Sequence, residues 1–227
     1  MTASRFSSAI FVSCLFCAGA PAAASTYVEP VDAGDLIGTA LAVGAGVSSI
    51  QGQIASNAST GVVDIDVYRL ELPAGEFSAA VTASTGTLDT ALVLFDGTGR
   101  GLRADDDSGD ADACAYCARV TETLPSPGTY YLAVFDVVDV DGPLSDDDSL
   151  MWDEYVLERV NAPPDGEGKD LPLAGWQLFE DSGYLLYATG DYTIELSPAT
   201  VPLPGALPLL ASALVGLGVL ARRRRGA

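Results

Sequence analysis

Aspartates crowd into one short stretch of the chain, and their spacing fits metal coordination. Residues 103–120 read RADDDSGDADACAYCARV, with five aspartates between positions 105 and 112. Ca²⁺ prefers about six to eight oxygen ligands, which alternating aspartates in a glycine-containing loop supply. Without a cation these carboxylates repel one another, and salt screens the repulsion only in part. The stretch predicts a calcium site, with a solvated acidic loop as the alternative, and the candidate ligands are Asp105, Asp107, Asp110 and Asp112.

Acidic residues elsewhere are candidate ligands of the same kind. Asp64 and Asp66 alternate at the start of a predicted strand, and Asp89 precedes the strand that leads into the aspartate-rich stretch. A second acidic stretch, VVDVDGPLSDDD at 137–148, partly follows the spacing of an EF-hand loop. Its first position holds Val137 instead of an acid, and no helical pattern flanks it. We therefore expect a looser calcium-binding or disordered acidic loop there.

Two cysteines follow the aspartates as Cys114-Ala-Tyr-Cys117. In an oxidising compartment, cysteines this close usually form a disulfide. Redox activity is the alternative, but a redox-active C-x-x-C begins a helix after a βα pattern, whereas this pair lies in an acidic β loop. Nearby carboxylates also raise the pKa of a thiol. We predict a structural disulfide between Cys114 and Cys117.

The composition excludes several classes of catalyst. The chain has no histidine, which removes serine–histidine and cysteine–histidine nucleophiles and histidine-ligated zinc. It also lacks a phosphate-binding G-x-x-x-x-G-K-[ST] loop and a dinucleotide-binding glycine pattern. Two of the many acids could still form the carboxylate pair of a glycoside hydrolase, so that class of enzyme stays open.

Alternating hydrophobicity predicts that residues 25–200 form one all-β domain. In DIDVYRLELPAG, Ile65 and Val67 share one face of a strand, whereas Asp66 and Tyr68 share the other. Short strands separated by Gly/Pro turns are typical of an antiparallel β-sandwich. We expect a loop at 161–168 and an acidic insertion at about 136–170. Further strands are predicted at 76–84, 90–95, around 102, 119–124, 129–135 and 190–197, with an edge strand at 46–56 and a strand or short helix at 154–160.

Aromatic residues could include a platform on which sugars stack, although core packing is the expected role of most of them. Tyr130 and Tyr131 must point to opposite faces of their strand. Trp152, beside the acidic insertion, is the aromatic residue that we expect to be exposed.

Both ends of the chain have the composition of export signals. Arg5 precedes an apolar run from Ala9 to Ala20, and small residues at 22–24 follow, as in a cleaved secretory signal peptide. At the other end, an apolar segment at 205–221 approaches the length that spans a bilayer. The arginines that follow it should remain in the cytoplasm. We predict a signal helix at 1–24 and a C-terminal transmembrane helix stopped by Arg222, Arg223, Arg224 and Arg225.

The tail at 201–227 resembles the VPLPA variant of the PEP-CTERM sorting signals. The motif residues are Val201, Pro202, Leu203 and Pro204, with Gly205 where the variant usually has alanine. The resemblance implies a Gram-negative envelope and processing near this motif by an exosortase-type transpeptidase. Removal of the N-terminal leader by signal peptidase is predicted from the leader itself. The resemblance further implies transient anchoring in the inner membrane, followed by release or attachment at the cell surface. A permanent C-terminal anchor is the alternative.

The body between the two signals is strongly acidic. The signals hold five of the 11 basic residues, whereas all 31 acidic residues lie between Glu29 and Glu195, so the body carries a charge of about −25. A charge of this sign and size argues against binding to nucleic acid or to an anionic membrane surface.

Four pieces of the body, in order, resemble the bacterial pre-peptidase C-terminal domain and its secreted relatives. They lie at 64–75, 87–99, 105–107 and 127–134. The resemblance implies a jelly-roll-like β-sandwich without catalytic activity, in a family whose members include polysaccharide-binding, collagen-binding and calcium-binding domains. We therefore expect an exported, surface-sorted structural or adhesive protein of the extracellular matrix, with calcium as its cofactor and polysaccharide as a partner. The alternatives are a carbohydrate-active enzyme and a module that assists a secreted protease.

Overall fold

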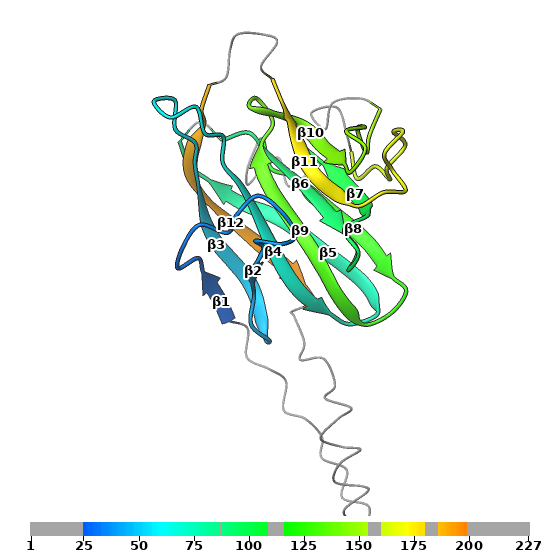
Figure 1. The fold of residues 1–227 in the computed structure, drawn as a ribbon. Coiled ribbons are helices and arrows are strands. Elements are labelled where there is room, and N and C mark those ends of the chain that lie inside the picture. Colours follow the sequence, from blue (N-terminus) through cyan, green and yellow to red (C-terminus); the bar gives the residue numbers. More distant parts are fainter. Residues whose placement is uncertain (1–24, 87, 109–115, 154–159, 180–185, 199–227) are drawn as a thin grey trace, which may run out of the picture.

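Strands and turns make up the part of the chain that the structure describes. It is a computed structural model, and it describes residues 25–86, 88–108, 116–153, 160–179 and 186–198. Two five-stranded sheets stack as a β-sandwich, and a two-stranded ribbon lies beside them (Figure 1). The predicted all-β class is confirmed for these residues, which contain no helix. Accordingly, they offer no apolar helix long enough to span a bilayer. The predicted signal helix and tail helix lie outside them.

The first sheet contains the beginning and the end of the described chain. In spatial order its strands are β1 (Ser25–Val28), β3 (Val47–Ala55), β12 (Thr189–Ser197), β5 (Gly75–Ser84) and β8 (Arg119–Leu124). All neighbours are antiparallel except β1, which runs parallel to β3. The prediction of an edge strand at 46–56 is wrong, because the short strand β1 covers that edge of β3.

The second sheet is apolar on both faces. Its order is β2 (Leu41–Ala42), β4 (Ile65–Leu72), β9 (Gly128–Asp136), β6 (Thr90–Phe95) and β7 (Gly101–Asp105). On β4, Tyr68 packs in the core between the two sheets, whereas Ile65 and Val67 pack in a second core on the outer face. The division of β4 into two faces, predicted from alternation, is thus confirmed. Every residue of β6 is buried because both of its faces are covered.

The outer core is covered by the segment that the sequence presented as an acidic insertion. Its strand β10 (Val140–Ser145) pairs with β11 (Leu173–Leu178), which follows the predicted insertion, to form the two-stranded ribbon. Trp152 is only 1% exposed and packs in the outer core, and its indole N–H donates to the carbonyl of Ala162. A Cβ added at Gly101 would lie 2.6 Å from the ring, so this glycine makes room for it. The predictions of an exposed Trp152 and of a loop throughout 137–148 are therefore wrong.

The physical reason lies in the apolar residues between the acids. Val137, Val140 and Met151 join Trp152 in covering the outer face of the second sheet. Burying this apolar surface is favourable enough to fold the segment onto the sheet despite its acidic residues. A prediction from charge alone therefore overestimates the exposure of the segment.

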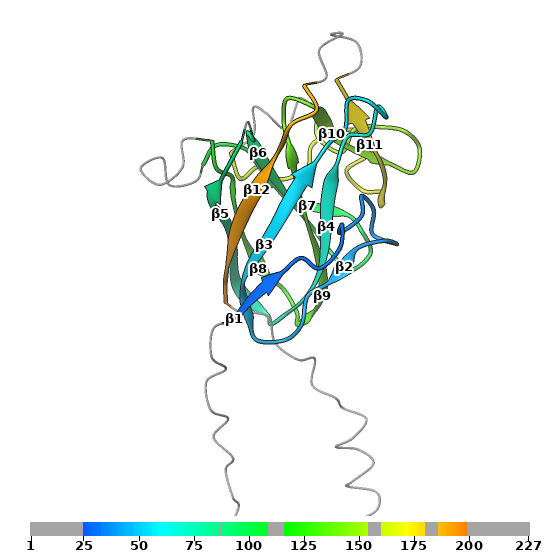
Figure 2. The same ribbon diagram turned by 90° about the vertical axis from the view of Figure 1, so that its left-hand side faces the viewer.

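The strand directions define two ends of the sandwich (Figure 2). β1 begins and β12 ends at one end, since Ser25 pairs with Val47 and Glu195 with Ser49. At the opposite end β4 and β6 begin and β7 and β9 end. We name this second end the acidic end, because Asp64, Asp89, Asp106 and Asp136 lie at these strand termini. The loop expected at 161–168 is confirmed, apart from one isolated bridge between Ala104 and Ala162.

Candidate cation-binding sites

Three carboxylates meet at the acidic end where two neighbouring strands begin and end. Asp89 directly precedes β6, whereas Asp106 and Asp107 directly follow β7, its antiparallel neighbour. One carboxylate oxygen from each residue lies within 4.8 Å of the others. We name these three residues the Asp106 cluster. The sequence pointed to Asp89 and Asp107 but not to Asp106, which lies between two residues of the alternating pattern.

Asp105, a predicted ligand, fastens the loop in which the cluster lies. Its side chain has no exposed surface. One carboxylate oxygen accepts hydrogen bonds from the backbone N–H groups of Ser108 and Arg119, at 3.1 and 2.7 Å. The other accepts from the backbone of Asn161, at 2.6 Å, and from the Ser108 hydroxyl. A carboxylate has about four lone-pair sites, so these four donors use the acceptor capacity of Asp105.

Asp106 has the opposite environment. It is 1% exposed, and both of its carboxylate oxygens are buried without a hydrogen-bond partner. Burial, together with the neighbouring carboxylates of Asp107, Asp89, Asp105 and Asp136, raises its pKa to about 8. A buried carboxylate without donors is costly unless it is neutralised by a proton, by a partner or by a metal ion.

The backbone around Asp89 is held firmly in place. Its N–H donates to the carboxylate of Asp136, at 2.9 Å, and its carbonyl accepts from the N–H of Val137, also at 2.9 Å. The other oxygen of Asp136 accepts from Val138. Burial raises the pKa of Asp136 to about 6. The end of β9 therefore positions Asp89 beside Asp106.

Some of the residues predicted as ligands or as disulfide partners in this stretch lie outside the part of the chain that the structure describes. Asp110, Asp112 and Cys114 are among those residues. Cys117 is disulfide-bonded and 1% exposed, and it packs in the core between the sheets. Its bond to Cys114 stays a prediction.

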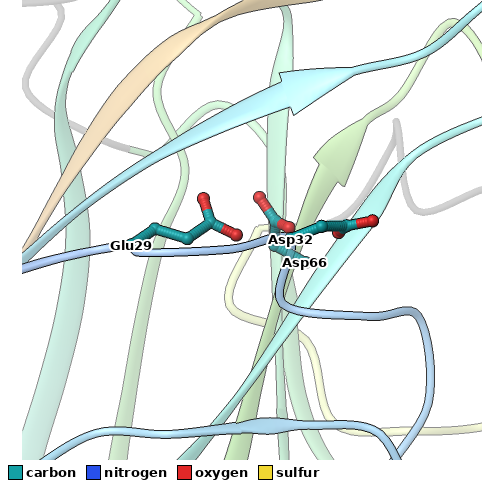
Figure 3. A group of neighbouring side chains, drawn as sticks. All are labelled: Glu29, Asp32 and Asp66. Atoms are coloured by element: carbon teal, nitrogen blue, oxygen red, sulfur yellow. The ribbon is translucent and has the colours of Figure 1, made fainter.

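A second group of acids, which we name the Glu29 cluster, contains Glu29, Asp32 and Asp66. Glu29 and Asp32 follow β1, and Asp66 is the second residue of β4. One carboxylate oxygen from each lies within 4.8 Å of the others, and Figure 3 shows the Glu29 side chain extending toward the other two. The sequence pointed to Asp66 but missed Glu29 and Asp32. The available signal was a pair of acids three residues apart near the start of the domain.

Asp66 differs from Asp106 because its carboxylate is partnered. It accepts a hydrogen bond from the Tyr192 hydroxyl, which lies 2.6 Å from the Tyr68 hydroxyl. Its other oxygen accepts a long bond from the N–H of Ala33, at 3.4 Å. Burial raises the pKa of Asp66 to about 8. Asp64, also a predicted ligand, accepts from the N–H of Ala55, and burial raises its pKa to about 6.

Two grooves lie beside the Glu29 cluster. The larger, of about 490 Å³, is lined by residues of β3 and β12 together with Val28 and Glu29. The smaller, of about 290 Å³, is lined by Glu29, Asp32 and Asp64 among others. An acid with a raised pKa in a cleft is the expected sign of a glycoside hydrolase. Asp66 has no exposed surface and lines neither groove. Glu29 and Asp64 line the smaller groove, and burial raises the pKa of both, so the carbohydrate-active alternative stays open.

Comparison with known proteins gives a partial family assignment. Residues 64–136, about a third of the chain, match the model of the bacterial pre-peptidase C-terminal domain. The match runs from Asp64 through the whole Asp106 cluster to Asp136, and it supports the resemblance stated from the sequence for this segment. Such domains are typically secreted, so the match is consistent with export. No curated protein matches the chain.

Among solved structures, the chain is similar to a periplasmic inhibitor of g-type lysozyme, PliG from Aeromonas hydrophila. The TM-score is 0.30 and the identity is 11%, over 77% of this chain and 100% of that chain. A likeness at this level does not bear on function.

Proposed function

We propose that this protein is an exported, non-enzymatic β-sandwich of jelly-roll-like connectivity that serves as a structural or adhesive component of the extracellular matrix and binds calcium. The observation that supports this most directly is that the described residues contain two clusters of three acids, each with one buried, one half-buried and one exposed member, whose carboxylate oxygens lie close enough to hold a cation. The match to a secreted domain family over residues 64–136 supports the non-catalytic part.

The direction of the strands supports a specific orientation at the cell surface. In the proposal, the segment at 201–227 is the sorting tail, processed by an exosortase-type transpeptidase after transient anchoring in the inner membrane. It follows the end of β12, whereas the Asp106 cluster lies at the acidic end (Figure 1). A sandwich held by this tail would direct its acidic end away from the membrane.

The charge of the body restricts which polymers it can bind directly. A body of about −25 repels acidic polysaccharides at short range. A divalent cation shared between a protein carboxylate and a polymer carboxylate removes that repulsion. Adhesion to an acidic polysaccharide should therefore depend on calcium, whereas adhesion to a neutral one should not.

Retention on immobilised polysaccharides tests this function. The purified full chain is passed over acidic and neutral polysaccharides in millimolar calcium and again in chelator. We expect retention on an acidic polysaccharide in calcium and release in chelator. Equal passage over every polysaccharide in both conditions would contradict the adhesive role.

A further inference from the structure

Asp106 stands out among the buried acids that the structure describes. It is the residue of this set in which both carboxylate oxygens are buried and lack a hydrogen-bond partner. Most of the other buried aspartates that the structure describes accept hydrogen bonds, although Asp141 also has one buried oxygen without a partner. The unexposed Asp139, for example, accepts from the N–H groups of Leu186, Tyr187 and Ala188, at 2.7, 3.0 and 2.7 Å. The same chain therefore leaves the Asp106 carboxylate free while fully bonding its neighbour Asp105.

The free oxygens of Asp106 face further unpaired carboxylate oxygens. Asp89 also has a buried oxygen, Oδ1, without a partner, and Asp107 completes the group with ligand oxygens within 4.8 Å of one another. The neighbours that act on the charge of Asp106 are all carboxylates. Three carboxylates that converge without a positive charge are unfavourable. The group therefore requires either a bound cation or a proton on at least one of the three acids.

We propose that Asp89, Asp106 and Asp107 bind one Ca²⁺ ion between the start of β6 and the end of β7. This inference specifies the calcium-binding part of the proposed function and rests on it. An all-oxygen donor set of carboxylates suits a hard cation and does not suit zinc or copper. Calcium fits better than magnesium because it accepts irregular geometry, and these ligands come from two separate segments.

The position of the site suggests two roles for the bound ion: contact with a ligand at the surface and ordering of the acidic end. Asp107 is exposed, so the cluster reaches the surface, and calcium has room for more ligands than three carboxylates supply. The open positions are available to water or to a carboxylate of an acidic polymer. The ion also joins β7 to β6 next to the loop that Asp105 fastens, so it should order the acidic end of the sandwich.

Calorimetric titration of CaCl₂ into the full chain tests the site, with Asp106→Asn as the variant and Asp146→Asn as the control. Asp146 is an exposed carboxylate outside both clusters. We expect the Asp106→Asn protein to bind one Ca²⁺ fewer than wild type, or to bind that ion at least tenfold more weakly. The control should match wild type. Counting ions separates this site from any calcium bound at the Glu29 cluster.

Folding of the variant is checked by its unfolding midpoint in chelator. An amide at this position needs neither a bound proton nor a counter-charge when it is buried, so Asp106→Asn should be at least as stable as wild type in chelator. Unchanged calcium binding by Asp106→Asn, or no calcium binding by wild type above pH 8, would overturn the proposal. A preference for MgCl₂ over CaCl₂ would overturn the choice of ion. Calcium binding without polysaccharide retention would refute the adhesive role and leave the site standing.

Discussion

Removing one hydroxyl group from the buried Tyr192 should destabilise the sandwich strongly. Tyr192, on β12, donates to the carboxylate of Asp66 on β4 of the opposite sheet, and its oxygen also lies 2.6 Å from the Tyr68 hydroxyl. Tyr192 is 2% exposed, and Asp66 and Tyr68 have no exposed surface. Tyr192→Phe keeps the ring but removes the hydroxyl that bonds to both Asp66 and Tyr68. Those two groups are buried and cannot bond to water instead, so the loss is costly.

The expected cost follows from the two bonds that are lost. Above pH 8, where Asp66 is ionised, a hydrogen bond to its charged carboxylate contributes about 1.5–3 kcal/mol, and a neutral hydrogen bond about 1 kcal/mol. Tyr192→Phe should therefore lower the free energy of unfolding by about 3 kcal/mol. For a protein of this size, 1 kcal/mol shifts the midpoint by about 2–4 °C, so the midpoint should fall by roughly 6–12 °C.

Thermal and urea unfolding, followed by circular dichroism, measure this difference. Tyr68→Phe is the matched control, since it removes a hydroxyl from the same chain of bonds but leaves the bond to Asp66 in place. Its cost should be about 1 kcal/mol. Equal stabilities of wild type and Tyr192→Phe, or a larger loss in Tyr68→Phe, would refute the assignment of Tyr192 as the donor that satisfies Asp66.

Three further changes test other parts of the fold by urea unfolding. Gly52→Ala should destabilise by about 1–3 kcal/mol, because a Cβ there would collide with both buried tyrosine hydroxyls; a neutral effect would contradict this close approach. Asp105→Ala should cost more than about 3 kcal/mol, since three backbone N–H groups lose their acceptor; a loss under 1 kcal/mol would contradict its fastening role. Burial raises the pKa of Asp141 to about 6 in the folded protein. Its protonated form is therefore favoured by folding, and its contribution to stability falls as the pH rises from about 4 through 6. Asp141→Asn should remove this fall and gain at most about 3 kcal/mol above pH 6; parallel pH profiles of the two proteins would contradict the shift.

The sequence predicts the central strands well because they are short runs rich in β-branched, aromatic and other apolar residues between turn residues. Tyr68 and Val67 lie on opposite sides of the second sheet, as the period of two requires. The strand at 46–56 was assigned correctly as a strand but wrongly as an edge. Its neighbour β1 has only four residues, and a pattern that short carries little periodic signal.

The acidic insertion shows where composition misleads. Trp152 was expected to be exposed because acids surround it in sequence, yet it is among the largest fully buried side chains. The strands of the second sheet carry apolar residues on both faces, and the sequence does not show which segment covers the outer face. That requires tertiary contacts between residues such as Trp152 and Gly101.

The candidate cation sites were predictable only in part for a similar reason. Spacing pointed to alternating aspartates, and Asp89 and Asp107 do lie together. Whether Asp105 or Asp106 is free depends on which of them meets the backbone donors of Ser108, Arg119 and Asn161. Those donors come from segments up to 56 residues away. The Glu29 cluster likewise forms only when the N-terminal segment lies across β4.

Thermal unfolding of the full chain, first in millimolar calcium and then in chelator, tests the central claim most directly. An ion that binds only the folded state adds about 2.7 kcal/mol at a hundredfold excess over its Kd, or roughly 5–11 °C in the midpoint for a protein of this size. The account predicts such a rise in calcium, its loss in chelator, and a smaller rise in Asp106→Asn. Identical midpoints in calcium and in chelator would contradict a calcium-dependent sandwich and leave its acidic end a solvated surface.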